Sequence, residues 1–162
     1  MSPAITRART STGAGVIAML VLVLAFGNQA YTEWAASHAQ GANAWDLLLR
    51  TLAWPKWFIT SGGNASQDVV AFDIRAVLLV VLVAVLLGLG SPRVTGGMGA
   101  FVLGWFAVIL AVAVAALLTA FLTSTASFYN ALLAAAAAST YGLFVGWIVG
   151  LATMAARRSG AP

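Results

Sequence analysis

Long apolar blocks constrain the fold of this chain more than any other feature of its sequence. Four of them give predicted membrane spans at 13–36, 68–90, 97–123 and 128–156. A helix rises about 1.5 Å per residue, so about 20 apolar residues cross the roughly 30 Å hydrocarbon core of a bilayer. The blocks are apolar on every face, whereas a lipid-facing barrel strand would alternate. The sequence therefore predicts an all-α integral membrane protein with four transmembrane helices.

Composition supports the same class. Hydrophobic residues make up 62% of the 162 residues and charged residues only 7%, whereas an ordinary soluble domain carries about 25% charged residues. We expect one membrane domain over 1–162. Its remaining parts are tails at 1–12 and 157–162, a loop at 91–96, a long loop at 37–67 and a turn at 124–127.

A secretory signal peptide is the alternative for the first block. Arg7 and Arg9 precede the apolar run, and the "SHA" at Ser37 to Ala39 loosely resembles a cleavage site. Under that alternative the first span would be removed or replaced.

The distribution of charge predicts the orientation of the spans. Arg7, Arg9, Arg93, Arg157 and Arg158 lie in the tails or in the 91–96 loop, whereas all four acids lie between residues 33 and 73, in or beside the 37–67 loop. By the positive-inside rule both termini are cytoplasmic, which makes 37–67 an extracytoplasmic loop. We expect a multi-pass plasma-membrane protein, and the alanine-rich, lysine-poor composition favours a bacterial inner membrane. Nothing points to nucleic acid.

The long loop contains a predicted interfacial helix at about 43–54. Asn43 is a suitable N-cap, Pro55 would end the helix, and apolar residues recur at helical spacing between them. Four tryptophans are expected to act as interfacial anchors: Trp34, Trp45, Trp54 and Trp57. The segment either anchors the bundle at the headgroup boundary or forms a lid or docking surface for a partner.

Charged residues are predicted to gather at the outer rim of the bundle, at the end of the first span and the start of the second. The cluster comprises Glu33, Asp68, Asp73 and Arg75. An inward-facing Arg75 needs a carboxylate, because a charge in lipid costs about 2.5–3.5 kcal/mol, and Glu33 or Asp73 could supply it. The cluster is either a structural pair or a site for a polar headgroup or a partner's charge.

Small residues recur at four-residue spacing on the last two spans. One row is Ala134, Ala138, Gly142, Gly146 and Gly150, and the other is Ala107, Ala111 and Ala115. Such GxxxG-like rows let helix backbones approach closely. The short turn at 124–127 makes these spans antiparallel neighbours, so packing within the chain is expected, with homo-oligomerisation or partner docking as the alternative.

The residues offer little for chemistry. There is no cysteine and one histidine, and the sequence has no metal, nucleotide or nucleophile motif, so no catalytic, cofactor or metal site is predicted. We expect a non-enzymatic subunit or accessory component of a membrane complex, in contact with the lipid bilayer and with a heteropartner or a second copy. The alternatives are an oligomeric channel or a lipid or small-molecule translocation component, and a membrane enzyme using the outer-rim carboxylates.

Overall fold

The computed structural model describes residues 3–58, 67–122 and 127–159. These residues form helices and no strand, which confirms the predicted all-helical fold. The helices are α1 (Pro3–Phe26), α2 (Gln29–His38), α3 (Ala44–Leu52), α4 (Gln67–Gly90), the short 3₁₀ helix η1 (Ser91–Arg93), α5 (Gly96–Leu122) and α6 (Phe128–Ser159).

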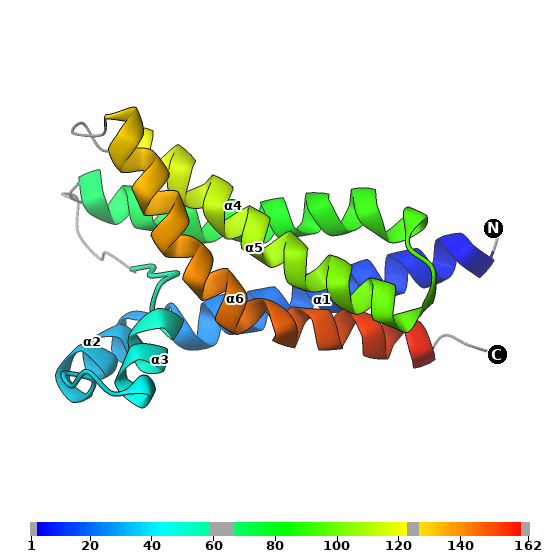
Figure 1. Ribbon diagram of the computed structural model, residues 1–162, viewed down its shortest axis with the longest axis horizontal. Coiled ribbons are helices and arrows are strands. Elements are labelled where there is room, and N and C mark those ends of the chain that lie inside the picture. The colour runs from blue at the N-terminus through cyan, green and yellow to red at the C-terminus, as the bar shows by residue number, and fades with distance from the viewer. Residues whose placement is uncertain (1–2, 59–66, 123–126, 160–162) are drawn as a thin grey trace.

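Four long helices, α1, α4, α5 and α6, form a bundle along the long axis of the molecule (Figure 1). The start of α1, the end of α6 and the α4–α5 connection lie at one end of this bundle. The short helices α2 and α3 lie at the opposite end and project to one side of it. The short helices are therefore separated from both chain ends by the length of the bundle.

Three of the long helices are long and apolar enough to cross a membrane, over Val69–Arg93, Gly96–Phe121 and Phe128–Arg158. A fourth span is possible only if Thr10–Phe26 and Gln29–His38 count as one, because they are bent by 60° relative to each other. The stretch predicted as one span at 13–36 is thus two helices. The Asn28 side chain stabilises the break, since it donates to the carbonyls of Leu24 and Ala25 and accepts from the amide of Tyr31.

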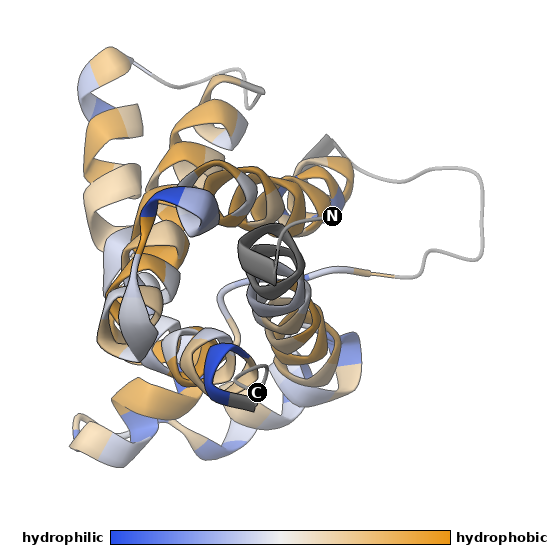
Figure 2. Ribbon diagram, turned by 90° about the vertical axis from the view of Figure 1, so that its right-hand side faces the viewer, coloured by the Kyte–Doolittle hydropathy of each residue, from blue (hydrophilic) through white to orange (hydrophobic). Residues whose placement is uncertain are grey.

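Apolar side chains cover much of the outer surface of the long helices. Val77 and Leu89 on α4, Leu110 on α5 and Leu132 on α6 are each about half exposed or more. Hydrophobic colour follows the long helices in Figure 2, and hydrophilic colour gathers near their ends and on the short helices. Helices that are apolar on their outer as well as inner faces match a lipid environment.

Helices α5 and α6 approach each other most closely at the glycines of α6. A Cβ added to Gly142 would lie 2.7 Å from Ile109 Cα, and one added to Gly146 would lie 2.9 Å from the Trp105 carbonyl oxygen. A Cβ on Gly104 of α5 would lie 2.8 Å from Gly150 Cα. The two backbones are in contact here, so the glycine row of α6 is occupied by α5 of the same chain.

Side-chain hydrogen bonds join the helices where the chain turns between α4 and α5. Arg157 near the end of α6 donates to the carbonyls of Ser91 and Val94. The hydroxyl groups of Ser11 and Thr12 on α1 lie 3.2 Å and 3.1 Å from the Ser91 hydroxyl. These bonds connect α1 and α6 to the turn that joins α4 and α5.

Candidate functional site

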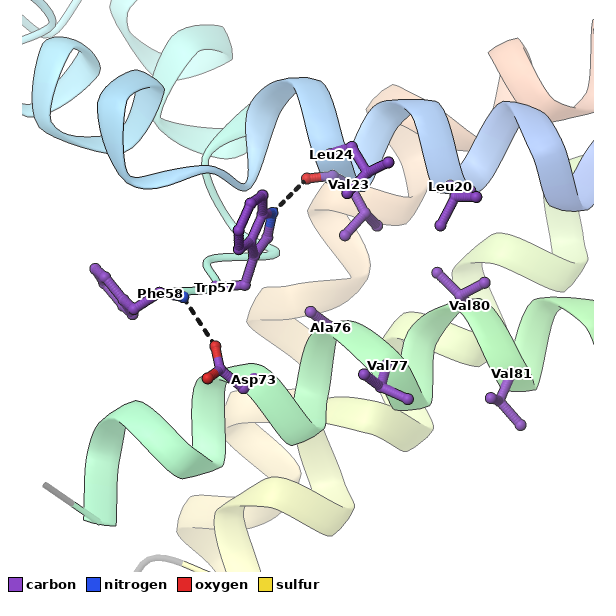
Figure 3. A pocket seen from close by; sticks show the side chains of 10 residues that line it. All are labelled: Leu20, Val23, Leu24, Trp57, Phe58, Asp73, Ala76, Val77, Val80 and Val81. Atoms are coloured by element: carbon purple, nitrogen blue, oxygen red, sulfur yellow. Dashed lines mark hydrogen bonds between the residues drawn. The ribbon is translucent and has the colours of Figure 1, made fainter. Parts of the chain in front are cut away.

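The strap, residues 53–58, follows α3 and lies against the break between α1 and α2. The backbone amide of Trp57 donates to the Gly27 carbonyl at 2.9 Å, and its indole Nε1 donates to the Val23 carbonyl at 3.0 Å (Figure 3). A Cβ on Gly27 would collide with the carbonyl oxygens of Pro55 and Val23. The strap thus supplies a donor to the Gly27 carbonyl at the break and a second donor to the Val23 carbonyl, which also accepts from the Gly27 amide.

Two charged residues of α4 hold the other side of the strap. The Asp73 carboxylate accepts a hydrogen bond of 2.8 Å from the amide of Phe58 (Figure 3). About half a helical turn further along α4, Arg75 Nη2 donates to the Trp54 carbonyl at 2.7 Å. Because α1 and α4 both bind the strap, it joins the two helices at this end of the bundle.

Arg75 is enclosed by aromatic rings. Its guanidinium carbon lies 4.5 Å from the centroid of the Trp54 ring and 4.9 Å from that of Phe72. Trp54 also stacks on Tyr141 of α6, with centroids 5.4 Å apart. The Arg75 Nε is buried and has no hydrogen-bond acceptor in the structure. The positive charge is therefore held by ring faces and one carbonyl.

The predicted outer-rim cluster is divided among different partners. Glu33 accepts a hydrogen bond from Gln29 on its own helix, and Asp73 is used by the strap. The expected pairing of Arg75 with Glu33 or Asp73 is absent from the described contacts, because Arg75 turns toward Trp54. Arg75 and Asp73 are two positions apart on a helix, which directs their side chains to different faces. The Asp68 side chain lies outside the described residues.

Two pockets adjoin this region. The larger, of about 400 Å³, lies between α1 and α4 beside Trp57 and Phe58, and Asp73 is its one charged lining residue (Figure 3). The smaller, of about 250 Å³, is lined by Trp54, Ala71, Phe72, Arg75, Ala116, Thr119, Ala120 and Ala134. The smaller pocket thus brings residues of α4, α5 and α6 together around Arg75.

The short helices form a unit of their own. The Tyr31 hydroxyl donates to the Leu49 carbonyl at 3.2 Å, and Arg50 donates to the carbonyls of Ala39 and Gly41. The N-cap of α3 is Asn43, as its sequence suggests, and Asp46 accepts from the Gly41 amide at 2.7 Å. The position of this unit relative to a bilayer stays a prediction.

The four tryptophans predicted as interfacial anchors fall into two pairs. Trp34 and Trp45, on α2 and α3, are exposed, at 45% and 64%. Trp54 and Trp57, in the strap, pack against the core of the bundle. The first pair is therefore more exposed than the second, which is half-buried. His38, which lies beside Trp34, stacks on its ring with centroids 5.0 Å apart.

The two rows of small residues have different surroundings. On α6, Gly142, Gly146 and Gly150 contact α5, Ala138 is buried in the core, and Ala134 is exposed. On α5, the predicted row of Ala107, Ala111 and Ala115 is buried. The atoms nearest the glycines belong instead to another row, which consists of Phe101, Trp105 and Ile109. Both the backbone and the side chains of that row meet the glycines, since Trp105 Cδ1 would lie 2.6 Å from a Cβ on Gly146 and Phe101 Cδ2 would lie 3.0 Å from one on Gly150.

Comparison with protein-family models, with curated proteins and with solved structures finds no match. Across residues 3–58, 67–122 and 127–159, no three His, Asp or Glu side chains are grouped so that they could hold a metal ion. The fold and the apolar helices define the class, a helical-bundle membrane protein with three or four helices able to span a bilayer.

Proposed function

We propose that this protein is a non-enzymatic integral membrane protein that acts as a subunit or accessory component of a membrane complex. The observation that carries the proposal is the exposed apolar surface of the short helices, with Trp45 64% and Leu47 55% exposed on α3 and Trp34 on α2. Tryptophan is the residue type most enriched at the energetic centres of protein interfaces. We assign the partner contact to this surface.

The way the other candidate surfaces are used supports this assignment. The α6 glycines contact α5, so they leave little room for a partner helix. On and beside the short helices, Asp46 and Arg50 bind backbone groups of their own chain. Trp45 and Leu47 are left exposed on α3.

The proposal includes a topology with four spans and both tails in the cytoplasm. Its support is the uneven distribution of charge along the bundle. Arg93, Arg157 and Arg158 belong to the end where α1 starts. Glu33, Asp46 and Asp73 belong to the opposite end, together with Arg50, Lys56 and Arg75. In this topology α2 and α3 are extracytoplasmic, and α3 lies at the membrane interface. The membrane would be a plasma membrane, and we infer a bacterial inner membrane.

Purification in mild detergent followed by mass spectrometry tests the proposal. We expect a stoichiometric heteropartner with the unaltered chain, and its loss when Trp45→Ser and Leu47→Ser are combined. Trp147→Ser is the matched control, because Trp147 is 47% exposed but lies on the long helix α6. A partner retained by the Trp45 and Leu47 variant would contradict the assignment of the surface. A defined homo-oligomer without a heteropartner would favour the second candidate instead.

The second candidate is a lipid or small-molecule translocation component, acting as an oligomeric channel. It is favoured by the 400 Å³ pocket between α1 and α4, whose lining is apolar apart from Asp73. A pocket of this size and character suits part of an acyl chain or a small apolar molecule.

A further inference from the structure

We propose that the 250 Å³ pocket around Arg75 is a binding site for a phosphate group. The inference goes beyond the proposed accessory function and does not depend on it. The pocket lies between α4, α5 and α6, and Trp54 of the strap covers one side of it. Arg75 is its charged lining residue, and the source of the phosphate is either a lipid headgroup or a soluble anion.

The positive charge of Arg75 lacks a counter-charge among the described residues. Among the residues that the structure describes, no carboxylate forms an ion pair with it, and its contacts are the Trp54 carbonyl and the rings of Trp54 and Phe72. A guanidinium carries five N–H donors, and the buried Nε–H has no acceptor. A charge removed from water is costly unless it is paired, so this group is poised to bind an anion.

The fork geometry of the guanidinium suits an oxyanion. Arginine binds phosphate and carboxylate with two parallel hydrogen bonds. A phosphate group takes roughly the space of two or three water molecules, at about 30 Å³ each. The 250 Å³ pocket therefore has room for a phosphate together with an adjoining group such as glycerol. Ala134 is both a lining residue and exposed, so the pocket reaches the surface of the molecule beside α6.

The position of Arg75 along α4 favours a lipid as the source. The span-like part of α4 begins at Val69, so Arg75 lies about 9 Å further along, at a rise of about 1.5 Å per residue. An arginine at that depth reaches back to the headgroup region, as long basic side chains near helix ends commonly do. The other lining residues are four alanines with Trp54, Phe72 and Thr119, and this mainly apolar lining suits the start of an acyl chain.

Contacts within the chain hold the Arg75 side chain in one position at the pocket. The bond from Nη2 to the Trp54 carbonyl and the contacts with the two rings fix the plane of the guanidinium. Asp73, the nearest acid in sequence, is used by the Phe58 amide and does not neutralise it. A fixed guanidinium that has no counter-charge among the described residues is preorganised, so little ordering remains when an anion binds.

Native mass spectrometry of the detergent-purified protein tests the site. The probes are dioleoylphosphatidylglycerol and, separately, inorganic phosphate. The variants are Arg75→Gln, which removes the charge, Arg75→Lys, which keeps the charge without the fork, and Ala134→Leu, which fills the pocket and leaves Arg75 in place. Arg93→Gln and Ala136→Leu are the matched controls, because Arg93 and Ala136 are exposed and do not line the pocket.

We expect the unaltered protein and both controls to retain one phosphatidylglycerol. Arg75→Gln and Ala134→Leu should weaken this binding about ten-fold or more, the size of a lost charge-assisted hydrogen bond, and Arg75→Lys should weaken it less. Binding of inorganic phosphate with the same dependence on Arg75 and Ala134, and no retained lipid, would support the site with a soluble anion as its source. Equal retention by Arg75→Gln, Ala134→Leu and the unaltered protein, with no phosphate binding, would overturn the proposal. Should Arg75→Gln fail to fold, Ala134→Leu alone gives the same decision.

Discussion

Single residues decide how closely the helices of this bundle can pack. At Gly142, a Cβ would come within 2.7 Å of Ile109 Cα, a backbone atom that cannot rotate aside. At Gly88, nothing lies within 4 Å of the same added atom. The two glycines share a helical environment but differ in what surrounds them. Only the first is required by packing.

Gly142→Ala should therefore destabilise the protein. We expect a loss of about 1–3 kcal/mol in the free energy of unfolding, because an added methyl group forces α5 and α6 apart. Denaturation in detergent micelles, followed by circular dichroism, measures it. The control Gly88→Ala should be neutral or slightly stabilising, since alanine is the better helix former by about 1 kcal/mol. Equal stability of Gly142→Ala and the unaltered chain would contradict a backbone contact at this position.

The spacing of small residues predicted the glycine row, whereas its acceptor could not be predicted in the same way. Ala107 and Trp105 belong to different four-residue rows on α5, and the choice between the rows depends on how the helix is rotated about its axis. That rotation is fixed by packing of several helices at once, and bonds such as the one from Thr153 to the Ala100 carbonyl are part of it. A row of small side chains indicates where a backbone can approach, but not which surface will do so.

At the scale of elements, the break between α1 and α2 is the least expected feature. The apolar block over 13–30, extended to residue 36, is long enough for one span. The local signal was the Gly27–Asn28 pair, since glycine followed by asparagine is common at helix ends and N-caps. The strap could not be predicted from the same pattern. Its binding to Gly27 and Val23 comes from Trp57, which is 30 positions away from Gly27 along the chain.

Asn28→Ala should loosen the break. Its side chain serves carbonyls of α1 and the Tyr31 amide of α2 at once, so we expect a loss of about 1 kcal/mol and faster hydrogen exchange in the first turn of α2. Exchange followed by mass spectrometry measures it. Gln40→Ala, at an exposed position after α2, should leave exchange unchanged. Unaltered exchange at Tyr31 in Asn28→Ala would show that the cap contributes nothing to the break.

The sequence predicted which charged residues belong to the candidate site but not which contacts they form. The sequence predicted charges at one rim of the bundle and an unmet need for a counter-charge at Arg75. It did not predict that Asp73 would bind the strap, because the Phe58 amide becomes available only when the strap crosses α4. The expected pair of Arg75 with Asp73 is therefore absent from the described contacts, and aromatic rings enclose Arg75 instead.

At the scale of the whole molecule, the account depends on which parts of the chain share a side of the membrane. Three spans follow from length and composition, and the fourth depends on the bent α1–α2 pair. If α1 crosses, α2 and α3 lie on the side opposite the chain's start. With the chain's start in the cytoplasm, as we propose, the partner surface and the phosphate site would belong to the extracytoplasmic side of the bilayer.

Labelling of single cysteines tests this topology most directly, because the chain has no cysteine of its own. The variants are Ser2→Cys, Ala42→Cys and Thr95→Cys, each treated with a membrane-impermeant maleimide on intact and on permeabilised cells. The account predicts that Ala42→Cys is labelled in intact cells, whereas Ser2→Cys and Thr95→Cys are labelled only after permeabilisation. Labelling of Ser2→Cys and Ala42→Cys from the same side would contradict it, because α1 would then not cross the membrane.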